Sequence, residues 1–292
     1  MRIIEQFVHG KRGEALCEDG IMITDHYVAV IDGSTSKSTA KLIDTDKTGG
    51  QIARDVVKEI VRAADPQFDM WTFCHHASEL MQMEYHWHMD AATRATLDTQ
   101  PENRFCCSAI IYSRHWNELW MIGDCHGLII DTIGSRPSYF HIKNDKPYEK
   151  DLAKMRSEFL TMALTDGVLD MNGKRKVYTI EELRKKDIGR ELLMPQLLNA
   201  MRDENITYPV IDGFPTPMKK CPCWGNFIKG VNQLVLATDG YPRLFPTLEK
   251  TEAYLQKLLA EDPLCIKKHK ATKGWMEGTE SFDDRAYVRI EI

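Results

Sequence analysis

The chain has 292 residues, 43% of them hydrophobic, and a formal net charge of −5 from 38 Lys and Arg against 43 Asp and Glu. A chain of this length can bury a large hydrophobic core, and we expect a single domain over residues 1–292. The acidic balance argues against non-specific nucleic-acid binding, which needs a basic surface. No apolar run approaches a membrane span and no signal peptide is evident, so we expect no membrane partner and a cytoplasmic location.

The first elements predicted in chain order are two strands and two helices. Residues 21–31 are expected to form two strands around a turn at Asp25-His26. A helix is predicted to open at Gly49-Gly50, because apolar residues then recur at helical spacing from Ile52 onward. A second helix is expected from about residue 70 to about residue 93.

The middle of the chain predicts a three-stranded meander. Its strands are expected at residues 105–113, 118–122 and 128–132. Asn117 marks the first turn, and Gly123-Asp124 begins the second. The sequence therefore predicts that these three strands pair in order within one sheet.

The second half of the chain mixes helices with isolated strands. Helices are predicted at 150–164, 180–202 and 248–260, strands at 233–237 and 286–292, and an irregular segment rich in Pro and Gly at 208–230. Strands and helices do not alternate regularly, which argues against a doubly wound parallel sheet. Two antiparallel sheets flanked by helices fit this order better.

Eight cysteines are scattered along the chain, and only Cys221 and Cys223 form a suggestive pair. A zinc site needs four ligands, usually supplied as two spaced pairs. No second pair at ligand spacing follows, so we interpret the cysteines as cytosolic thiols.

Four aspartates lie at the ends of predicted strands or beside them: Asp19, Asp32, Asp239 and Asp283. A strand fixes its end closely, so carboxylates from distant segments can converge on one point. Carboxylates close together repel and persist only where cations neutralise them. Oxygen-only ligands favour Mg²⁺ or Mn²⁺. A single Asp-Gly after a strand is more often a turn, but the four together favour a metal site.

An ordered series of motifs runs through the chain: ED at residues 18–19, VAVIDG at 28–33, a GD turn at 123–124, LATDG at 236–240 and DD at 283–284. This series resembles the metal-dependent (PPM-type) protein phosphatases, the type 2C serine/threonine phosphatases. The resemblance implies an α/β (α+β) fold, a four-layer α-β-β-α sandwich with two mainly antiparallel sheets. It also implies that metal ions bind at one edge of the sheets.

The resemblance implies a catalytic role for residues at two strand ends. Asp32 matches the family's bridging carboxylate, and the carbonyl of Gly33 matches a ligand of the second ion. Asp239 matches the carboxylate at the end of a later central strand. Two Mg²⁺ or Mn²⁺ ions held there would lower the pKa of a bridging water, which then attacks phosphorus in line.

Five further carboxylates match metal-site positions of the family. Glu18 and Asp19 match an acidic pair that holds metal-bound waters. Asp283 matches the Asp of an Asp-Asn pair with Asp284 in the Asn position, although a one-residue slip would make Asp284 the ligand. Asp124 matches an Asp that helps to bind a third ion in some members.

Two positions depart from the family pattern. Glu14 stands where members usually have the Arg that grips phosphate, and Ser34 stands where many have a His. A phosphate dianion near carboxylates needs a compensating cation. Arg12 and Lys37 are the predicted phosphate-binding residues, and Lys11 is a third candidate.

The leading hypothesis is a metal-dependent phosphatase that hydrolyses phosphoserine or phosphothreonine with a water activated by two metal ions. The first alternative is a catalytically weak relative that binds a phosphorylated partner. The second is a metal-dependent hydrolase of small phosphoesters. The expected partners are therefore a phosphorylated protein or a small phosphoester, with no nucleic acid and no membrane.

Overall fold

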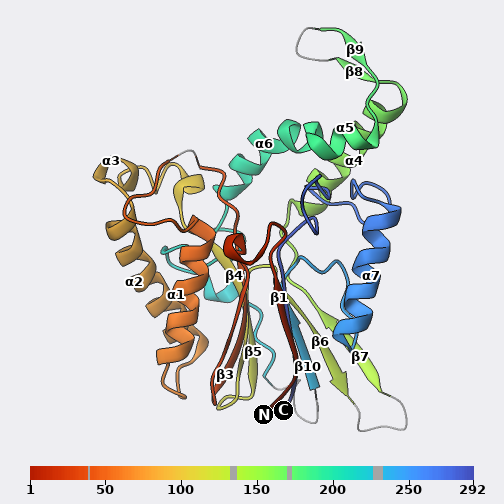
Figure 1. Ribbon diagram of the computed structural model, residues 1–292. Coiled ribbons are helices and arrows are strands. Elements are labelled where there is room, and N and C mark those ends of the chain that lie inside the picture. The colour runs from red at the N-terminus through yellow and green to blue at the C-terminus, as the bar shows by residue number, and fades with distance from the viewer. Residues whose placement is uncertain (39, 132–136, 170–172, 226–232) are drawn as a thin grey trace.

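Two antiparallel sheets form the centre of the molecule in a computed structural model that describes residues 1–38, 40–131, 137–169, 173–225 and 233–292 (Figure 1). The five-stranded sheet has the order β1 (Arg2–His9), β11 (Arg285–Glu291), β10 (Gln233–Ala237), β6 (His126–Asp131) and β7 (Ser138–Ile142). The four-stranded sheet has the order β2 (Gly20–Ile23), β3 (Tyr27–Gly33), β4 (Cys107–Ser113) and β5 (Glu118–Ile122).

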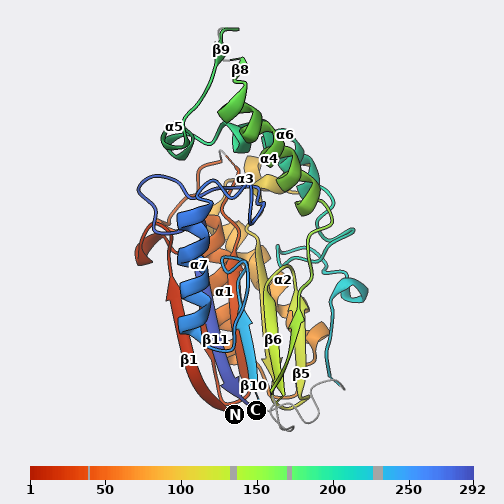
Figure 2. The ribbon, with the colours of Figure 1, turned by 90° about the vertical axis from the view of Figure 1, so that its right-hand side faces the viewer.

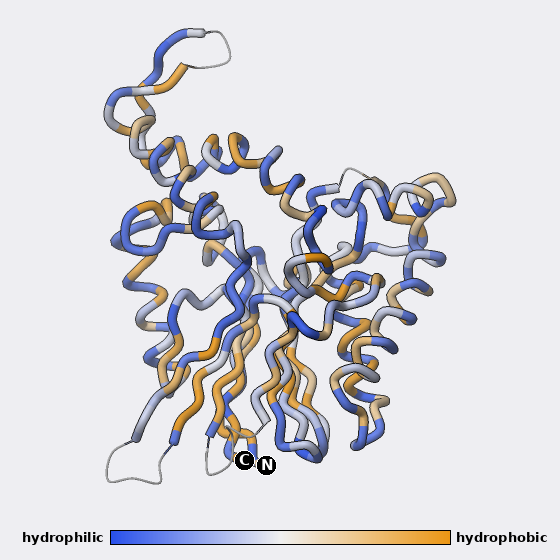
Figure 3. Tube along the Cα trace, turned by 180° about the vertical axis from the view of Figure 1, so that it is seen from behind, coloured by the Kyte–Doolittle hydropathy of each residue, from blue (hydrophilic) through white to orange (hydrophobic). Residues whose placement is uncertain are grey.

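Period-two alternation in the strands builds one core between the sheets and one on each outer face. In β3, Tyr27, Ala29 and Ile31 belong to the core under the helices. Val28 and Val30 point the other way, into the core shared with β10 and β11. Both sets are buried, because successive side chains of a strand face opposite sides of a sheet. Figure 3 shows this concentration of apolar residues along the strands.

Helices cover the outer face of each sheet. Helix α1 (Gly49–Ala63) packs on the four-stranded sheet, and α2 (Met70–His88) packs beside it. Helix α7 (Leu248–Glu261) covers the five-stranded sheet. The molecule is therefore a four-layer α-β-β-α sandwich, which confirms the predicted fold class (Figure 2).

A helical roof stands over one end of the sandwich (Figures 1 and 2). It comprises α4 (Glu149–Thr165), the hairpin of β8 (Val168–Leu169) and β9 (Arg175–Lys176), α5 (Ile180–Lys185) and α6 (Ile188–Met201). The remaining short elements are α3 (Ala91–Arg94) and the 3-10 helices η1 (Glu14–Leu16), η2 (Pro101–Asn103) and η3 (Met218–Lys220). Within the described ranges, no helix combines the length and the apolar character that a bilayer crossing demands.

The predicted meander is wrong in its third strand. β4 pairs with β5, but β6 pairs with β10 and β7 in the other sheet. Gly123, with φ of 95°, lies in the turn where the chain changes sheets, a conformation that favours glycine. The prediction also missed β7, an edge strand whose first four residues are exposed and which therefore lacks the alternating pattern.

Two predicted long helices are each divided by an aspartate. The helix expected over residues 70–93 ends at His88, and the one expected over 180–202 divides into α5 and α6. Asp90 caps α3 by accepting a hydrogen bond from the Thr93 N–H, and Asp187 caps α6 in the same way. An aspartate in this position begins a new helix, because its carboxylate satisfies an otherwise free N–H group.

One arginine ties the helical roof to the loop that follows α7. The buried Arg156 side chain forms an ion pair with Asp187, with 2.6 Å between Nη2 and Oδ2. Its Nη1 also donates to the carbonyls of Leu264 at 2.9 Å and Ala271 at 3.1 Å. A single guanidinium therefore fixes α4, the start of α6 and the loop 262–283 relative to one another.

We expect Arg156→Met to destabilise the protein, because it leaves Asp187 without its buried partner. Loss of one partner of a buried ion pair costs about 3 kcal/mol or more, which corresponds to a fall in Tm of about 6 °C. Lys154→Met, at an exposed site on the same helix, is the matched control and should change stability by less than about 0.5 kcal/mol. Equal Tm values for the two variants in thermal denaturation would contradict this role for Arg156.

Candidate active site

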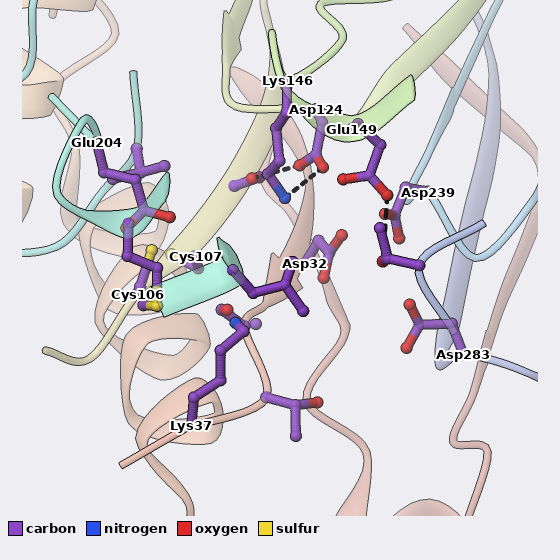
Figure 4. Close-up of a pocket in the computed structure, with 18 of the residues that line it drawn as sticks. Asp32, Lys37, Cys106, Cys107, Asp124, Lys146, Glu149, Glu204, Asp239 and Asp283 are labelled. Atoms are coloured by element: carbon purple, nitrogen blue, oxygen red, sulfur yellow. Dashed lines mark hydrogen bonds and ion pairs between the residues drawn. The ribbon is translucent and has the colours of Figure 1, made fainter. Parts of the chain in front are cut away.

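Four aspartates meet in one cavity at the end of the sandwich that lies beneath the helical roof: Asp32, Asp124, Asp239 and Asp283 (Figure 4). Strand register explains their convergence. In the four-stranded sheet, Gly33 at the end of β3 pairs with Cys107 at the start of β4. In the five-stranded sheet, Ala237 at the end of β10 pairs with both His126 and Tyr287. The aspartates beside these strand ends therefore share one edge.

Asp32 and Asp239 are neighbouring carboxylates whose pKa values shift in opposite directions. Burial, together with the nearby charge of Asp239, raises the pKa of Asp32 well above its usual range. Burial would also raise the pKa of Asp239, but the ammonium groups of Lys273, Lys146 and Lys143 hold it well below its usual range. Neighbouring carboxylates repel one another unless a cation neutralises them, so this pair is suited to a bound cation.

Asp283 is held between two lysines. Its Oδ1 lies 2.9 Å from Nζ of Lys11, and its Oδ2 pairs with Nζ of Lys273. Lys11 follows β1 and Lys273 lies in the loop after α7, so two distant segments neutralise this carboxylate. Both oxygens of Asp283 therefore have a positive partner.

Asp124 has a similar arrangement at the turn between β5 and β6. Its Oδ2 lies 2.6 Å from Nζ of Lys146, and its Oδ1 accepts a hydrogen bond of 2.7 Å from the Ser108 hydroxyl. The pair with Asp124 raises the pKa of Lys146 well above its usual range although burial opposes the charge. Lys146 is therefore a fixed positive charge in the cavity.

Glu18 and Asp284 lie behind the cavity and do not line it. Asp284 accepts hydrogen bonds from the N–H groups of Lys11 at 2.7 Å and Glu18 at 2.9 Å. Glu18 accepts 2.5 Å hydrogen bonds from the hydroxyls of Thr35 and Thr48. These carboxylates order the surrounding loops, and of the pair 283–284 it is Asp283 that faces the cavity.

Asp19 is buried with one oxygen, Oδ2, that has no hydrogen-bond partner among the described residues. Burial raises the pKa of Asp19 to about 8, against a lowering hydrogen bond from Thr238, and the charges of Asp284 and Asp239 raise it further. A buried polar atom without a partner destabilises the fold by about 1–3 kcal/mol. Asp19 is therefore a buried carboxylate with one unsatisfied oxygen, and it is not among the residues that line the cavity.

Gly33 lines the cavity where helix α1 begins. A Cβ at Gly33 would lie 2.5 Å from the backbone oxygens of both Glu18 and Gly50. Only glycine permits this approach. The backbone of Gly33, a predicted metal ligand, therefore packs closely between Glu18 and the start of α1.

The carboxylate pair fits an oxygen-binding cation such as Mg²⁺ or Mn²⁺. Among the described residues no group of three or more His, Cys, Asp or Glu side chains is arranged to hold a metal ion. Mg²⁺, however, is commonly held by one or two carboxylates and keeps several waters. Asp32 and Asp239, which line the cavity together, offer such a pair.

Four basic side chains line the same cavity: Lys37, Lys146, Arg190 and Lys273. The sequence predicted only Lys37, whereas the other three lie on loops or on the roof without a recognisable motif. Arg12, the other predicted phosphate-binding residue, is exposed and is not among the residues that line the cavity. In Figure 4, Lys37 and Glu204 lie across the cavity from Asp239 and Asp283.

Cys106 and Cys107 also line the cavity, which the sequence did not indicate. Burial raises the pKa of each thiol well above its usual range, and nearby carboxylates raise it further. Protonated thiols are poor nucleophiles, so these cysteines are unsuited to attack a substrate.

The fold is similar to that of several bacterial phosphatases, whereas no family model matches the chain and no curated protein matches its sequence. Stp1, a serine/threonine phosphatase from Staphylococcus aureus, is 12% identical with a TM-score of 0.46, and the match covers 100% of this chain and 95% of that one. PstP/Ppp, a serine/threonine phosphatase from Mycobacterium tuberculosis, is 15% identical with a TM-score of 0.41, covering 100% and 99%. PppA from Pseudomonas aeruginosa is 10% identical with a TM-score of 0.47, covering 99% and 96%.

We expect Asp19→Asn to stabilise the metal-free protein at neutral pH, because a neutral amide avoids the free-energy cost of burying a carboxyl group whose pKa is raised to about 8. A gain of about 1–3 kcal/mol would raise Tm by about 2–6 °C. Asp284→Asn is the matched control and should lower Tm, since both Asp284 oxygens accept backbone hydrogen bonds. Thermal denaturation in the presence of a chelator measures both, and a lower Tm for Asp19→Asn would show that this carboxylate is satisfied.

Proposed function

We propose that this chain is a Mg²⁺- or Mn²⁺-dependent phosphatase that hydrolyses phosphoserine or phosphothreonine. The observation that supports the proposal best is the composition of the cavity. Asp32 and Asp239 form a pair suited to a divalent ion, and basic side chains suited to a phosphate dianion stand around them. A phosphoester needs both groups, because carboxylates alone would repel it.

In this proposal Asp32 and Asp239 hold the ion, and the carbonyl of Gly33 is a further candidate ligand. A divalent ion bound there would supply a water of lowered pKa and would offset charge on the phosphoryl group. Asp124 and Asp283 are predicted ligands from the sequence, as are the second and third ions, and these remain predictions. Glu18, Asp19 and Asp284 would support the site from behind.

Lys37 is the proposed phosphate-binding residue, and Arg190 from the roof is the second candidate. Burial lowers the pKa of Lys37 to about 8, and Arg190 lowers it further while Glu204 opposes the shift. Arg190 is held by hydrogen bonds of 3.1 and 3.0 Å to the carbonyl and hydroxyl of Thr272. These cations would orient the phosphoryl group against the carboxylate end of the cavity.

The roof favours small phosphoesters as the second candidate substrate class. Leu197, Met201 and Glu204, on α6 and just after it, line the cavity from above, so part of the substrate would be enclosed. Turnover of a phosphopeptide panel against small phosphoesters distinguishes the classes. A preference of tenfold or more in kcat/KM for small esters would overturn the protein-phosphatase assignment.

We expect phosphate-ester hydrolysis to require added Mn²⁺ or Mg²⁺ and to stop with a chelator. Asp32→Asn and Asp239→Asn should each lower kcat by about 100-fold or more, because each deletes a ligand charge while preserving side-chain shape. Cys125→Ser and Cys223→Ser should retain turnover near that of the unmodified chain. Full activity in Asp239→Asn, measured by phosphate release, would rule out the proposed centre.

Lys37→Ala should raise KM for a phosphorylated substrate by about tenfold, which corresponds to about 1.4 kcal/mol of binding. Arg12→Ala is the matched control, because Arg12 is exposed and outside the cavity. Steady-state kinetics measure both. Unchanged KM in Lys37→Ala, together with low turnover of the unmodified chain, would favour the weak relative that binds a phosphorylated partner.

A further inference from the structure

The four cavity aspartates are not equivalent as ligands for a cation. Asp124 has one ammonium group in direct contact, from Lys146, and Asp283 has two, from Lys11 and Lys273. Within the described part of the chain, no lysine or arginine forms an ion pair with Asp32 or Asp239, although both line the cavity. Asp32 and Asp239 are therefore the cavity aspartates whose carboxylates are not already occupied by an ammonium group.

Hydrogen bonds from the helical roof hold the loop that carries Lys273. The preceding residue, Thr272, accepts hydrogen bonds from Arg190 and donates one of 3.3 Å to Glu149. The carbonyl of Ala271, two residues before Lys273, accepts a hydrogen bond of 3.1 Å from Arg156. Three contacts from the roof thus fix the loop that carries the Lys273 ammonium to Asp283.

Lys146 is fixed just as firmly on the other side of the cavity. Its partner Asp124 is buried, Lys146 itself is partly buried, and Asp124 is also held by Ser108. In a buried pair, removal of one charge leaves the other uncompensated at a cost of several kcal/mol. A metal ion would have to displace an ammonium group to reach Asp124 or Asp283.

We propose that Lys146 and Lys273 neutralise Asp124 and Asp283 in place of further metal ions, so that the chain binds a single divalent ion at Asp32 and Asp239. The inference rests on the proposed function, since it concerns how that site is charged. Asp283 is then an anchor for Lys273 and not a metal ligand. The two ammonium groups supply fixed positive charge beside the phosphoryl position. This charge does not depend on the concentration of metal ions.

Metal titration of the chelator-stripped full chain tests this proposal without relying on activity. Isothermal titration calorimetry with Mn²⁺, supported by the EPR signal of free Mn²⁺, should give one ion per chain. Asp283→Asn should leave that number at one. Lys11→Met combined with Lys273→Met should raise it to two, because Asp283 then loses both of its ammonium partners, and the further change Asp283→Asn should return it to one.

Lys270→Met, at an exposed position in the same loop, is the matched control and should bind one ion. Two or more ions in the unmodified chain, with one lost in Asp283→Asn, would overturn the inference. No second ion in the Lys11→Met, Lys273→Met double variant with native circular dichroism would also count against it. No binding in the unmodified chain would instead remove the metal-dependent function proposed above, so the two failures are distinguishable.

Discussion

Repulsion among carboxylates gathered at one edge of two sheets is the constraint on which the rest of this structure depends. The register of β3, β10 and β11 brings the charges together whether or not they are favourable. Each carboxylate therefore needs a hydrogen-bond donor or a cation, and the kind of group that supplies it differs from one carboxylate to the next. Backbone N–H groups serve Asp284, hydroxyls serve Glu18, and ammonium groups serve Asp124 and Asp283.

The carboxylates that remain after this compensation define the chemistry of the cavity. Asp32 and Asp239 line the cavity, and no lysine or arginine among the described residues forms an ion pair with either of them. Asp19, just behind, keeps one oxygen without a partner. A site that destabilises the fold in this way commonly serves function, since stability could be gained by simple substitution.

The strands and their carboxylates could be predicted from the sequence because both depend on local pattern. Alternation in β3 specifies which side chains face which core, and the end of the strand then places Asp32. The family resemblance carried by the aspartate motifs implied the sandwich, which the structure confirms. Helix α1 was predicted with its start at Gly49, where Thr48 and Gln51 form a capping box.

Long-range contacts decide the parts that the sequence could not predict. Nothing local distinguishes Lys273 from other lysines in its loop, since its position follows from Arg156, more than a hundred residues earlier. The sheet change at Gly123 depends on which strand β6 meets, and β10 is about a hundred residues further along. Asp90 and Asp187, at which the predicted long helices divide, are residues that commonly cap helices. Apolar periodicity on both sides of each aspartate nevertheless predicted one continuous helix.

The place of β11 also sets the order in which the molecule can be completed during synthesis. This strand is the final one in the sequence, yet it lies between β1 and β10 inside the five-stranded sheet. Until β11 has been synthesised, β1 lacks its partner strand in that sheet and Asp283 is absent from the edge. The strands of the four-stranded sheet, by contrast, all lie within residues 20–122 and can pair earlier. The non-local pairing of β11 slows folding and leaves apolar strand edges exposed meanwhile.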